Sequence, residues 1–277
     1  MTALNYLESL NPLQYESVCS TEGPNLIIAG AGTGKTKVLT TRVAHIIDNN
    51  LAFPSQILCV TFTNKAAREM SERVQKLVNQ NMEKMPWMGT FHSIGAKIIR
   101  NHAEVIGLKQ SFTILDKDDQ LSLIKQIIKA ENLDQSQFSP KLIQSKIDHW
   151  KNKALNPNEI KSETLDNLVD EKSLSIYQIY QARLFEINCL DFGDLLLQCI
   201  NLFKVPDIHK RYSNNFKYIH VDEYQDTNAA QYKWLKLLGS HHQNVCCVGD
   251  DDQSIYSWRG AEVDNMLRFE KEFENAK

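Results

Sequence analysis

The sequence AGAGTGKT at residues 29–36 decides the fold of this chain, because it joins a short apolar run to a helix-forming segment. Its three glycines let the backbone curve closely around phosphate oxygens. Lys35 would place a positive charge beside the β and γ phosphates, and the Thr36 hydroxyl would be a ligand for Mg²⁺. A helix beginning at Lys35 would direct its positive N-terminal end at the same phosphates. The stretch therefore predicts a phosphate-binding loop, with Ala29 in place of the glycine that opens the strict pattern.

A second motif, VDEYQD at residues 221–226, lies far along the chain and ends another apolar run. Asp222 is placed to hold magnesium, directly or through water, and Glu223 is placed as the base that polarises an attacking water. Carboxylates here would also suit the N-terminal end of a helix, which is the alternative interpretation. Because a phosphate loop lies upstream, the pair of motifs is typical of a nucleoside-triphosphate hydrolase.

Four apolar runs have the length and composition of buried strands. They cover residues 25–29, 57–62, 218–221 and 245–248. Helix-forming segments follow the first two runs, one from Lys35 and one over about residues 64–79. Continuous apolar strands that alternate with helices are typical of a parallel sheet covered on both faces. The sequence therefore predicts an α/β core built on a parallel sheet.

The region between residues 103 and 190 has a different pattern. No glycine occurs between Gly107 and Gly193, and apolar side chains recur every three to four residues, as in amphipathic helices. The spaced residues are Leu121, Ile124, Ile127 and Ile128; Leu142, Ile143, Ile147 and Trp150; and Leu174, Tyr177, Tyr180, Leu184 and Ile187. Pro140 and Pro157 are expected near helix starts. We predict a mostly helical domain inserted into the α/β core.

The overall composition narrows the class of protein. The 277 residues carry a formal net charge of −3, so no overall basic field favours nucleic acid, although a local patch would still bind phosphates. The six cysteines show no C-x-x-C spacing, which argues against a cysteine metal site. No run has the length of a membrane span, and the first residues lack the features of a signal peptide. We therefore expect a cytoplasmic protein with no membrane partner.

Several further stretches, in the same order along the chain, resemble the UvrD/Rep-type DNA helicases of superfamily 1. The sequence LNPLQ at residues 10–14 is similar to the Q motif of that family, and AGAGTGKT is similar to its motif I. The other matches are motif Ia (60–67), motif Ib (89–93), the D-F-x-D-L block (190–195), motif II (222–228) and motif III (248–260). These matches extend over nearly the whole chain.

The resemblance implies a RecA-like P-loop NTPase core formed by residues 1–102 and 191–277, called domain 1A in the family. The helical insert, residues 103–190, would be domain 1B. Motifs IV, V and VI and the second RecA-like domain are absent from the sequence, so we expect the N-terminal half of a helicase, from an expressed fragment or from a split or decayed gene. Two departures stand out: Lys37 replaces a common arginine, and Gly193 replaces a common acid.

The expected site residues follow from these matches. The catalytic residues are Lys35, Glu223 and Gln253, the last as a sensor of the γ phosphate, and the metal ligands are Thr36 and Asp222. The ATP-binding residues are Gln14, Ala29, Gly30, Ala31, Gly32, Thr33, Gly34, Lys35, Thr36 and Lys37. The DNA-binding residues are Phe62, Asn64, Lys65, His92, Tyr256, Trp258 and Arg259. The aromatic members would stack on bases, and a buried core ring is the alternative for Trp258. For His92 a DNA contact and a coupling hydrogen bond are both open.

The function implied is an ATP-dependent DNA helicase with 3′ to 5′ translocation, acting in DNA repair or replication. Its cofactors would be ATP and Mg²⁺. Its partners would be single-stranded DNA, junctions of single and double strands, and the C-terminal half of the helicase. The alternative is a nucleotide- and DNA-binding fragment without efficient turnover. A small-molecule kinase or a regulatory GTPase is disfavoured, because no N-K-x-D block for guanine occurs.

Overall fold

A computed structural model describes residues 6–30, 32–78, 85–161, 163, 165, 167–250, 269, 271, 273 and 275–277. The chain divides into two compact units. The first unit comprises Met1–Ile94, Pro206–Asn228 and Leu235–Lys277, and the second comprises Gly95–Val205 and Ala229–Trp234. Within the described ranges, no helix combines the length and the apolar character that crossing a bilayer requires.

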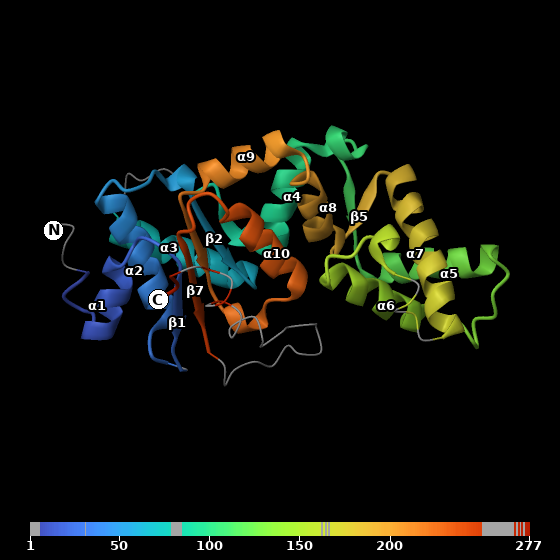
Figure 1. The fold of residues 1–277 in the computed structure, drawn as a ribbon, viewed down its shortest axis with the longest axis horizontal. Coiled ribbons are helices and arrows are strands. Elements are labelled where there is room, and N and C mark those ends of the chain that lie inside the picture. The colour runs from blue at the N-terminus through green and yellow to red at the C-terminus, as the bar shows by residue number, and fades with distance from the viewer. Residues whose placement is uncertain are drawn as a thin grey trace. The chain divides into compact units, whose positions relative to one another are not determined.

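A five-stranded sheet forms the centre of the first unit, with every neighbouring pair parallel (Figure 1). The strand order is β1-β7-β6-β2-β3. The strands are β1 (Asn25–Ile28), β2 (Ile57–Thr61), β3 (Met88–Thr90), β6 (Tyr218–Val221) and β7 (Val245–Gly249). All residues of β2, β6 and β7 are buried, as expected for the inner strands of a parallel sheet. The predicted α/β fold with a parallel sheet is therefore confirmed, and β3 is a strand that the apolar runs did not reveal.

Strand β7 lies between the two strands that carry the predicted motifs. Its pairing with β1 sets Ile28 opposite Gly249, and its pairing with β6 sets Val221 opposite Cys247. The Ala29 amide extends the ladder by donating to the Gly249 carbonyl at 3.0 Å. Since parallel strands end at the same edge of a sheet, the phosphate loop after β1 and the acidic motif after β6 are brought to either side of the end of β7.

Helices α1, α2, α3 and α9 belong to the first unit and span Pro12–Cys19, Lys35–Asp48, Asn64–Leu77 and Pro206–Asn215. The start of α1 is fixed by a capping box between Asn11 and Gln14, and the start of α3 by the Thr63 hydroxyl, which accepts from the Ala66 amide at 3.1 Å. The apolar sides of α2 and α3 pack with the strands in one cluster that includes Leu39, Val74 and Cys59. Short 3₁₀ turns complete the unit at Pro54–Gln56 (η1) and Tyr224–Asp226 (η5).

The second unit is mostly helical. Its helices are α5 (Lys117–Ala130), α6 (Pro140–Asn152), α7 (Leu168–Glu186) and α8 (Asp194–Leu202), with 3₁₀ turns η2 (Ala103–Ile106) and η3 (Pro157–Glu159). Helices α4 (Phe91–Asn101) and α10 (Ala229–Leu238) each contribute residues to both units. Helices α5, α6 and α7 share one apolar core, in which the rings of Trp150 and Tyr177 stack at 5.9 Å.

The helical periodicity predicted most of this core, and Leu121, Leu142 and Ile187 are the predicted residues that do not belong to it. Leu142 and Ile187 are 45% and 53% exposed, so their assignment to the apolar pattern was wrong. Leu142 lies beside the buried Ile143 in α6 and therefore points to another side of the helix, whereas Ile187 follows the last residue of α7. The helical pattern also did not reveal a two-stranded parallel sheet of β4 (Thr113–Leu115) and β5 (Cys189–Asp191). The assignment of residues 103–190 to a separate domain stays a prediction.

Candidate nucleotide-binding site

The loop between β1 and α2 takes a conformation that its glycines permit. Gly32 and Gly34 have φ of +73° and +94°, values that side-chain-bearing residues rarely adopt. Gly34 is the N-cap of α2 and offers no side chain, which leaves the first amides of the helix without a side-chain cap. The Thr33 hydroxyl donates to the Gly30 carbonyl at 2.7 Å and steadies the bend. A helix beginning with uncapped amides beside a glycine loop is suited to bind an anion.

The Lys35 side chain is directed into this site and not into solvent. Only 9% of it is exposed, and its Nζ atom lies 3.0 Å from the Oδ2 atom of Asp250, which is 2% exposed. Asp250 follows β7 directly, so the pair joins residues that are 215 positions apart in sequence. The neighbouring Thr36 is half-buried. Lys35 is therefore held at the end of the sheet, where a bound phosphate would meet it.

Helix α1 is tied to the phosphate loop by Gln14. Its side-chain Nε2 donates to the Thr33 carbonyl at 2.9 Å, and its Oε1 accepts from the Asn11 amide at 3.1 Å. A Cβ on Gly34 would lie 3.1 Å from the same Nε2 atom, so the glycine allows this close approach. Lys37 makes a second link, because its Nζ donates to the Ser9 carbonyl at 2.7 Å. Gln14 and Lys37 thus lie beside the loop, as the sequence predicts for ATP-binding residues.

Asp222 and Glu223 follow β6 at the same edge of the sheet. Asp222 is 4% exposed, and its amide donates to the Val60 carbonyl at 3.0 Å. Burial and the adjacent Glu223 carboxylate raise the pKa of Asp222 to about 6. Glu223 has a φ of +52°, a left-handed conformation that a non-glycine residue adopts only where its surroundings impose it. Its Oε2 atom accepts from the Nε2 atom of Gln225 at 2.7 Å, which fixes the direction of the carboxylate.

The donor set at this edge suits Mg²⁺ bound to a nucleotide. Burial and the charge of Glu223 disfavour the ionised form of Asp222. A nearby cation would stabilise that ionised form. Magnesium takes oxygen ligands, and it is usually bound by one or two carboxylates together with substrate phosphates and waters. Among the described residues no group of three or more His, Cys, Asp or Glu side chains forms a cage for a metal. That Asp222 and the Thr36 hydroxyl would be the protein ligands of such an ion stays a prediction.

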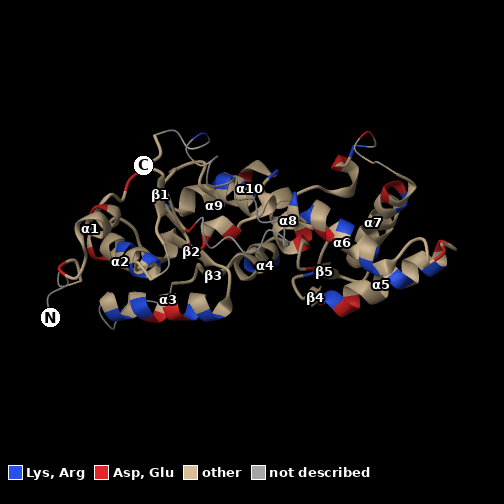
Figure 2. Cartoon of the chain, turned by 90° about the horizontal axis from the view of Figure 1, so that it is seen from below, with Lys and Arg blue, Asp and Glu red and all other residues tan. Residues whose placement is uncertain are grey.

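Four of the seven residues predicted to bind DNA are among the described residues, and they lie after β2 and β3, at the same edge of the sheet. The Phe62 ring is half-buried and meets the buried Phe91 ring edge-on, with centroids 5.7 Å apart. Lys65 is 89% exposed, and Asn64 begins helix α3, whose acidic side chains lie between basic ones (Figure 2). His92 is half-buried in α4, and burial lowers its pKa. These four residues therefore come from two neighbouring strand ends.

Comparisons with known proteins identify the family of this chain. Residues 10–274 match the UvrD/REP helicase N-terminal domain. The chain belongs to this family. It is 51% identical to DNA helicase II of Rickettsia typhi (strain ATCC VR-144 / Wilmington) over 276 residues, which cover 98% of this chain and 42% of that protein. It is 49% identical to the ATP-dependent DNA helicase PcrA of Staphylococcus aureus (strain Mu50 / ATCC 700699) over 271 residues, which cover 98% of this chain and 37% of PcrA.

The UvrD/REP N-terminal domain is thus found here in a chain that spans about two fifths of the length of the curated relatives it matches. Five of the predicted site residues lie outside the described residues. They are Ala31, Gln253, Tyr256, Trp258 and Arg259.

Two residues of this site were not predicted, although both lie in the motifs that were recognised. Asp250 engages Lys35, and Gln225 contacts both Asp250 and Glu223: its Oε1 accepts from the Asp250 amide at 3.0 Å, and its Nε2 donates to the Glu223 carboxylate. Their positions after β7 and β6 were a usable signal. The sequence could not show that β7 pairs between β1 and β6, which is what brings them together.

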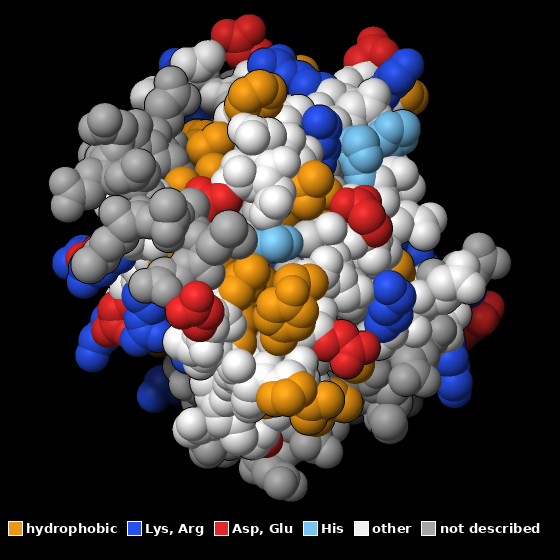
Figure 3. Space-filling model, turned by 90° about the vertical axis from the view of Figure 1, so that its left-hand side faces the viewer, with side chains coloured by type: hydrophobic (Ala, Val, Ile, Leu, Met, Phe, Trp, Pro, Cys, Tyr) orange, Lys and Arg blue, Asp and Glu red, His pale blue; other side chains and the backbone are white. Residues whose placement is uncertain are grey.

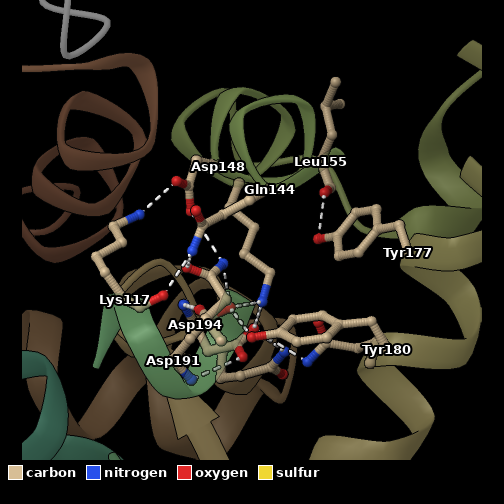
Figure 4. A network of polar contacts seen from close by, with 12 residues as sticks. Lys117, Gln144, Asp148, Leu155, Tyr177, Tyr180, Asp191 and Asp194 are labelled. Carbon is tan, nitrogen blue, oxygen red and sulfur yellow. Dashed lines mark hydrogen bonds and ion pairs between the residues drawn. The ribbon is translucent and has the colours of Figure 1, made fainter. Parts of the chain in front are cut away.

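The D-F-x-D-L block at residues 190–195 has a partner that the sequence also did not reveal. Lys151 of α6 is completely buried, and its Nζ lies 2.7 Å from Asp191 and 2.9 Å from Asp194 (Figure 4). The hydroxyl of Tyr180 donates to the same Asp191 oxygen at 2.9 Å. A Cβ on Gly193 would lie 2.9 Å from the Lys151 Cδ atom, so this glycine makes room for the lysine. A side chain at position 193 would therefore require the lysine to move.

Proposed function

We propose that this chain is the ATP-binding part of a DNA helicase, which hydrolyses ATP with Mg²⁺ and uses the energy to move along single-stranded DNA. The observation that carries the proposal is the convergence of the phosphate loop, Asp222 and Glu223 at the two sides of the end of β7. Membership of the UvrD/REP family and the similarity to ATP-dependent DNA helicases support it. The 3′ to 5′ direction, a role in repair or replication, and a cytoplasmic location belong to the same proposal.

The roles follow from the positions of the side chains. The glycine loop and the first amides of α2 would hold the phosphates, Lys35 would neutralise their charge, and Gln14 and Lys37 would contact the base. Thr36 and Asp222 hold Mg²⁺, which would neutralise charge on the phosphates when bound. Glu223 is half-buried and aimed by Gln225, which suits a base that takes a proton from water. Gln253 would sense the γ phosphate.

For DNA, the proposed track consists of Phe62, Asn64, Lys65 and His92, continued by Tyr256, Trp258 and Arg259. Stacking of a base on an aromatic ring is worth about 1–3 kcal/mol and does not depend on sequence. Phe62→Ala and Trp258→Ala should each weaken binding of single-stranded DNA by about 1–3 kcal/mol while ATP affinity stays nearly unchanged. Titrations with a labelled oligonucleotide and with a labelled nucleotide measure both. A variant that unfolds, or that keeps its DNA affinity, would place that ring in the core.

The second candidate function is binding of nucleotide and DNA without efficient turnover. The 277 residues span 42% and 37% of two curated relatives, so the rest of those proteins has no counterpart in this sequence. In related phosphoryl-transfer systems, an arginine supplied across a cleft is worth about 10³–10⁵ in rate. The proposed C-terminal half would also cover apolar side chains: Leu13 and Ile28 are 76% and 59% exposed, and hydrophobic side chains gather on the face seen in Figure 3.

Steady-state ATP hydrolysis with and without single-stranded DNA separates the two functions. We expect slow hydrolysis and little stimulation by DNA from this chain alone, and strong stimulation when a relative's C-terminal half is fused to it. Glu223→Gln is the matched control, because it keeps the shape of the side chain and removes the base; turnover should fall by about 10²–10⁴-fold with ATP affinity preserved. Hydrolysis that is unaffected by Glu223→Gln would argue against this active site.

A further inference from the structure

The ion pair between Lys35 and Asp250 occupies the point where a phosphate would bind. The two atoms are 3.0 Å apart, and the side chains are 9% and 2% exposed. A buried ammonium group needs an anionic partner, since an unpaired charge in the interior costs several kcal/mol. In this structure Asp250 provides that partner. A nucleotide phosphate would offer Lys35 a second anion in the same place.

Two anions compete for one lysine in such a site. A carboxylate within hydrogen-bond distance of Lys35 would lie a few ångströms from a bound phosphate, and like charges at that separation repel each other strongly in a buried setting. The repulsion is relieved if the carboxylate moves away when phosphate arrives. Asp250 is well placed to move, because it is the first residue after the last strand, β7, and not a member of the ladder.

The backbone of Asp250 is also linked to the proposed catalytic base. The backbone amide of Asp250 donates to the Oε1 atom of Gln225 at 3.0 Å. The Nε2 atom of the Gln225 side chain in turn donates to the Glu223 carboxylate at 2.7 Å. Gln225 is 1% exposed, so it has little freedom to make other contacts. The chain of contacts Lys35–Asp250–Gln225–Glu223 therefore joins the ends of all three strands that form the site.

We propose that Asp250 is a placeholder for nucleotide phosphate: it holds Lys35 while no phosphate is bound, gives it up when phosphate arrives, and passes this exchange through Gln225 to Glu223. The inference rests on the proposed ATP binding and adds to it a regulatory role for Asp250. The placeholder role predicts that removing the Asp250 carboxylate increases the affinity for nucleotide. An acid that served only as a metal ligand, directly or through water, would have the opposite effect.

The test is the affinity of the full 277-residue chain for ATP, measured by competition against a fluorescent ATP analogue in excess EDTA. Without a divalent cation, any contribution of Asp250 to metal binding is removed. Asp250→Asn should bind ATP about fivefold or more tightly than the wild type. The matched control is Asp226→Asn, which removes the same charge from a buried position in the neighbouring turn η5, and it should change the affinity less than twofold.

Equal or weaker binding by Asp250→Asn in EDTA would overturn the placeholder role, as would an equal gain in Asp226→Asn. If Asp250→Asn does not fold, as judged by circular dichroism, Asp250→Ser replaces it in the same assay, and it should also bind ATP more tightly than the wild type.

The link to Glu223 is tested by Gln225→Leu. This variant should lower the single-turnover rate about tenfold or more and keep ATP affinity within twofold; an unchanged rate would overturn the link. A wild type that binds no ATP with Mg²⁺ would instead overturn the proposed function itself.

Discussion

Two lysines in this chain are buried against aspartates, and the difference between them separates a permanent ion pair from an exchangeable one. Lys151 is completely buried, lies within 3 Å of two carboxylates, and has the rings of Tyr177 and Tyr180 at 5.6 and 5.2 Å. Lys35 lies 3.0 Å from Asp250 and adjoins a glycine loop whose members are partly or fully exposed. The same chemical pair thus serves stability where it is enclosed, and it can serve ligand exchange where one side is left accessible.

The electrostatics of the enclosed cluster show how closely its members depend on each other. Burial by itself would lower the pKa of Lys151, but the Asp191 and Asp194 carboxylates outweigh burial and raise it. The charge and hydrogen bond of Lys151, together with hydrogen bonds from the Asp194 amide and the Tyr180 hydroxyl, outweigh burial and lower the pKa of Asp191. Burial and the charge of Asp191 raise the pKa of Asp194. One lysine therefore compensates one aspartate well and the other incompletely.

The largest expected effect is the loss of stability caused by Lys151→Met. This substitution leaves two buried carboxylates without their cation, which should lower the free energy of unfolding by about 3–5 kcal/mol. Urea denaturation followed by circular dichroism measures the loss. Adding Asp191→Asn and Asp194→Asn to the variant should recover part of it, because the uncompensated charges are then removed. A single variant as stable as the wild type would contradict the structural role of the cluster.

Replacing the other lysine, Lys35, by methionine should affect ATP binding more than stability. Lys35→Met is expected to weaken ATP binding about 100-fold, because the cation that faces the phosphates is lost. Its unfolding free energy should fall by less than in Lys151→Met, since one buried carboxylate, and not two, is left without its cation. Calorimetric titration with ATP and Mg²⁺, paired with urea denaturation, gives both numbers. If Lys35→Met kept the nucleotide affinity of the wild type, Lys35 would not serve ligand binding, and the proposed difference from Lys151 would be wrong.

A smaller loss of stability is expected at Gly193, which makes room for the aliphatic part of the Lys151 side chain. A methyl group added at Gly193 would lie 2.9 and 3.0 Å from two carbons of Lys151, so Gly193→Ala should cost about 1–2 kcal/mol of stability. Gly30→Ala is the control from the other site, because its added methyl group would approach no atom closer than 4.0 Å. Thermal melting of both variants compares them. Equal melting temperatures would mean that the Lys151 stem can shift at little cost.

The smallest effect concerns pH. The pKa of Asp194 is raised above its unfolded value, to about 6, so the folded protein holds this proton more tightly and gains stability as the pH falls through 6. Between pH 7 and pH 5 the gain is about 1 kcal/mol from this group. Asp194→Asn should abolish that part of the pH dependence, because the amide does not titrate. Melting curves of both proteins across this interval give the difference, and parallel curves would count against the raised pKa.

The sequence predicted what depends on neighbouring residues. The apolar runs predicted β1, β2, β6 and β7, and the glycines of residues 29–36 predicted the turn into α2 at Lys35. Strands of three residues, β3, β4 and β5, were missed because a pattern that short does not distinguish a strand from a loop or a helix end.

The partners of the two buried lysines escaped prediction for a different reason. Lys35 and Asp250 are 215 positions apart and meet because β7 pairs with β1, whereas Lys151 and Asp191 are 40 apart and meet because helix α6 packs beside the end of β5. A recognised motif identifies chemically important residues without giving their contacts before a ligand binds. The predicted roles of Asp222 and Glu223 could be stated from sequence, whereas the raised pKa of one and the left-handed backbone of the other required the fold.

The position of β7 has a consequence for how the protein is made. Strands β1 and β6 each pair with β7 and not with each other, so both present open edges until residues 245–249 insert between them. Pairings between such distant segments form slowly, and synthesis delivers the N-terminal strand first. A nascent chain that has released β6 but not β7 therefore carries the glycine loop and Lys35 without the aspartate that holds it. During that interval the unpaired edges of β1 and β6 are open to pairing with other chains, and the insertion of β7 closes both.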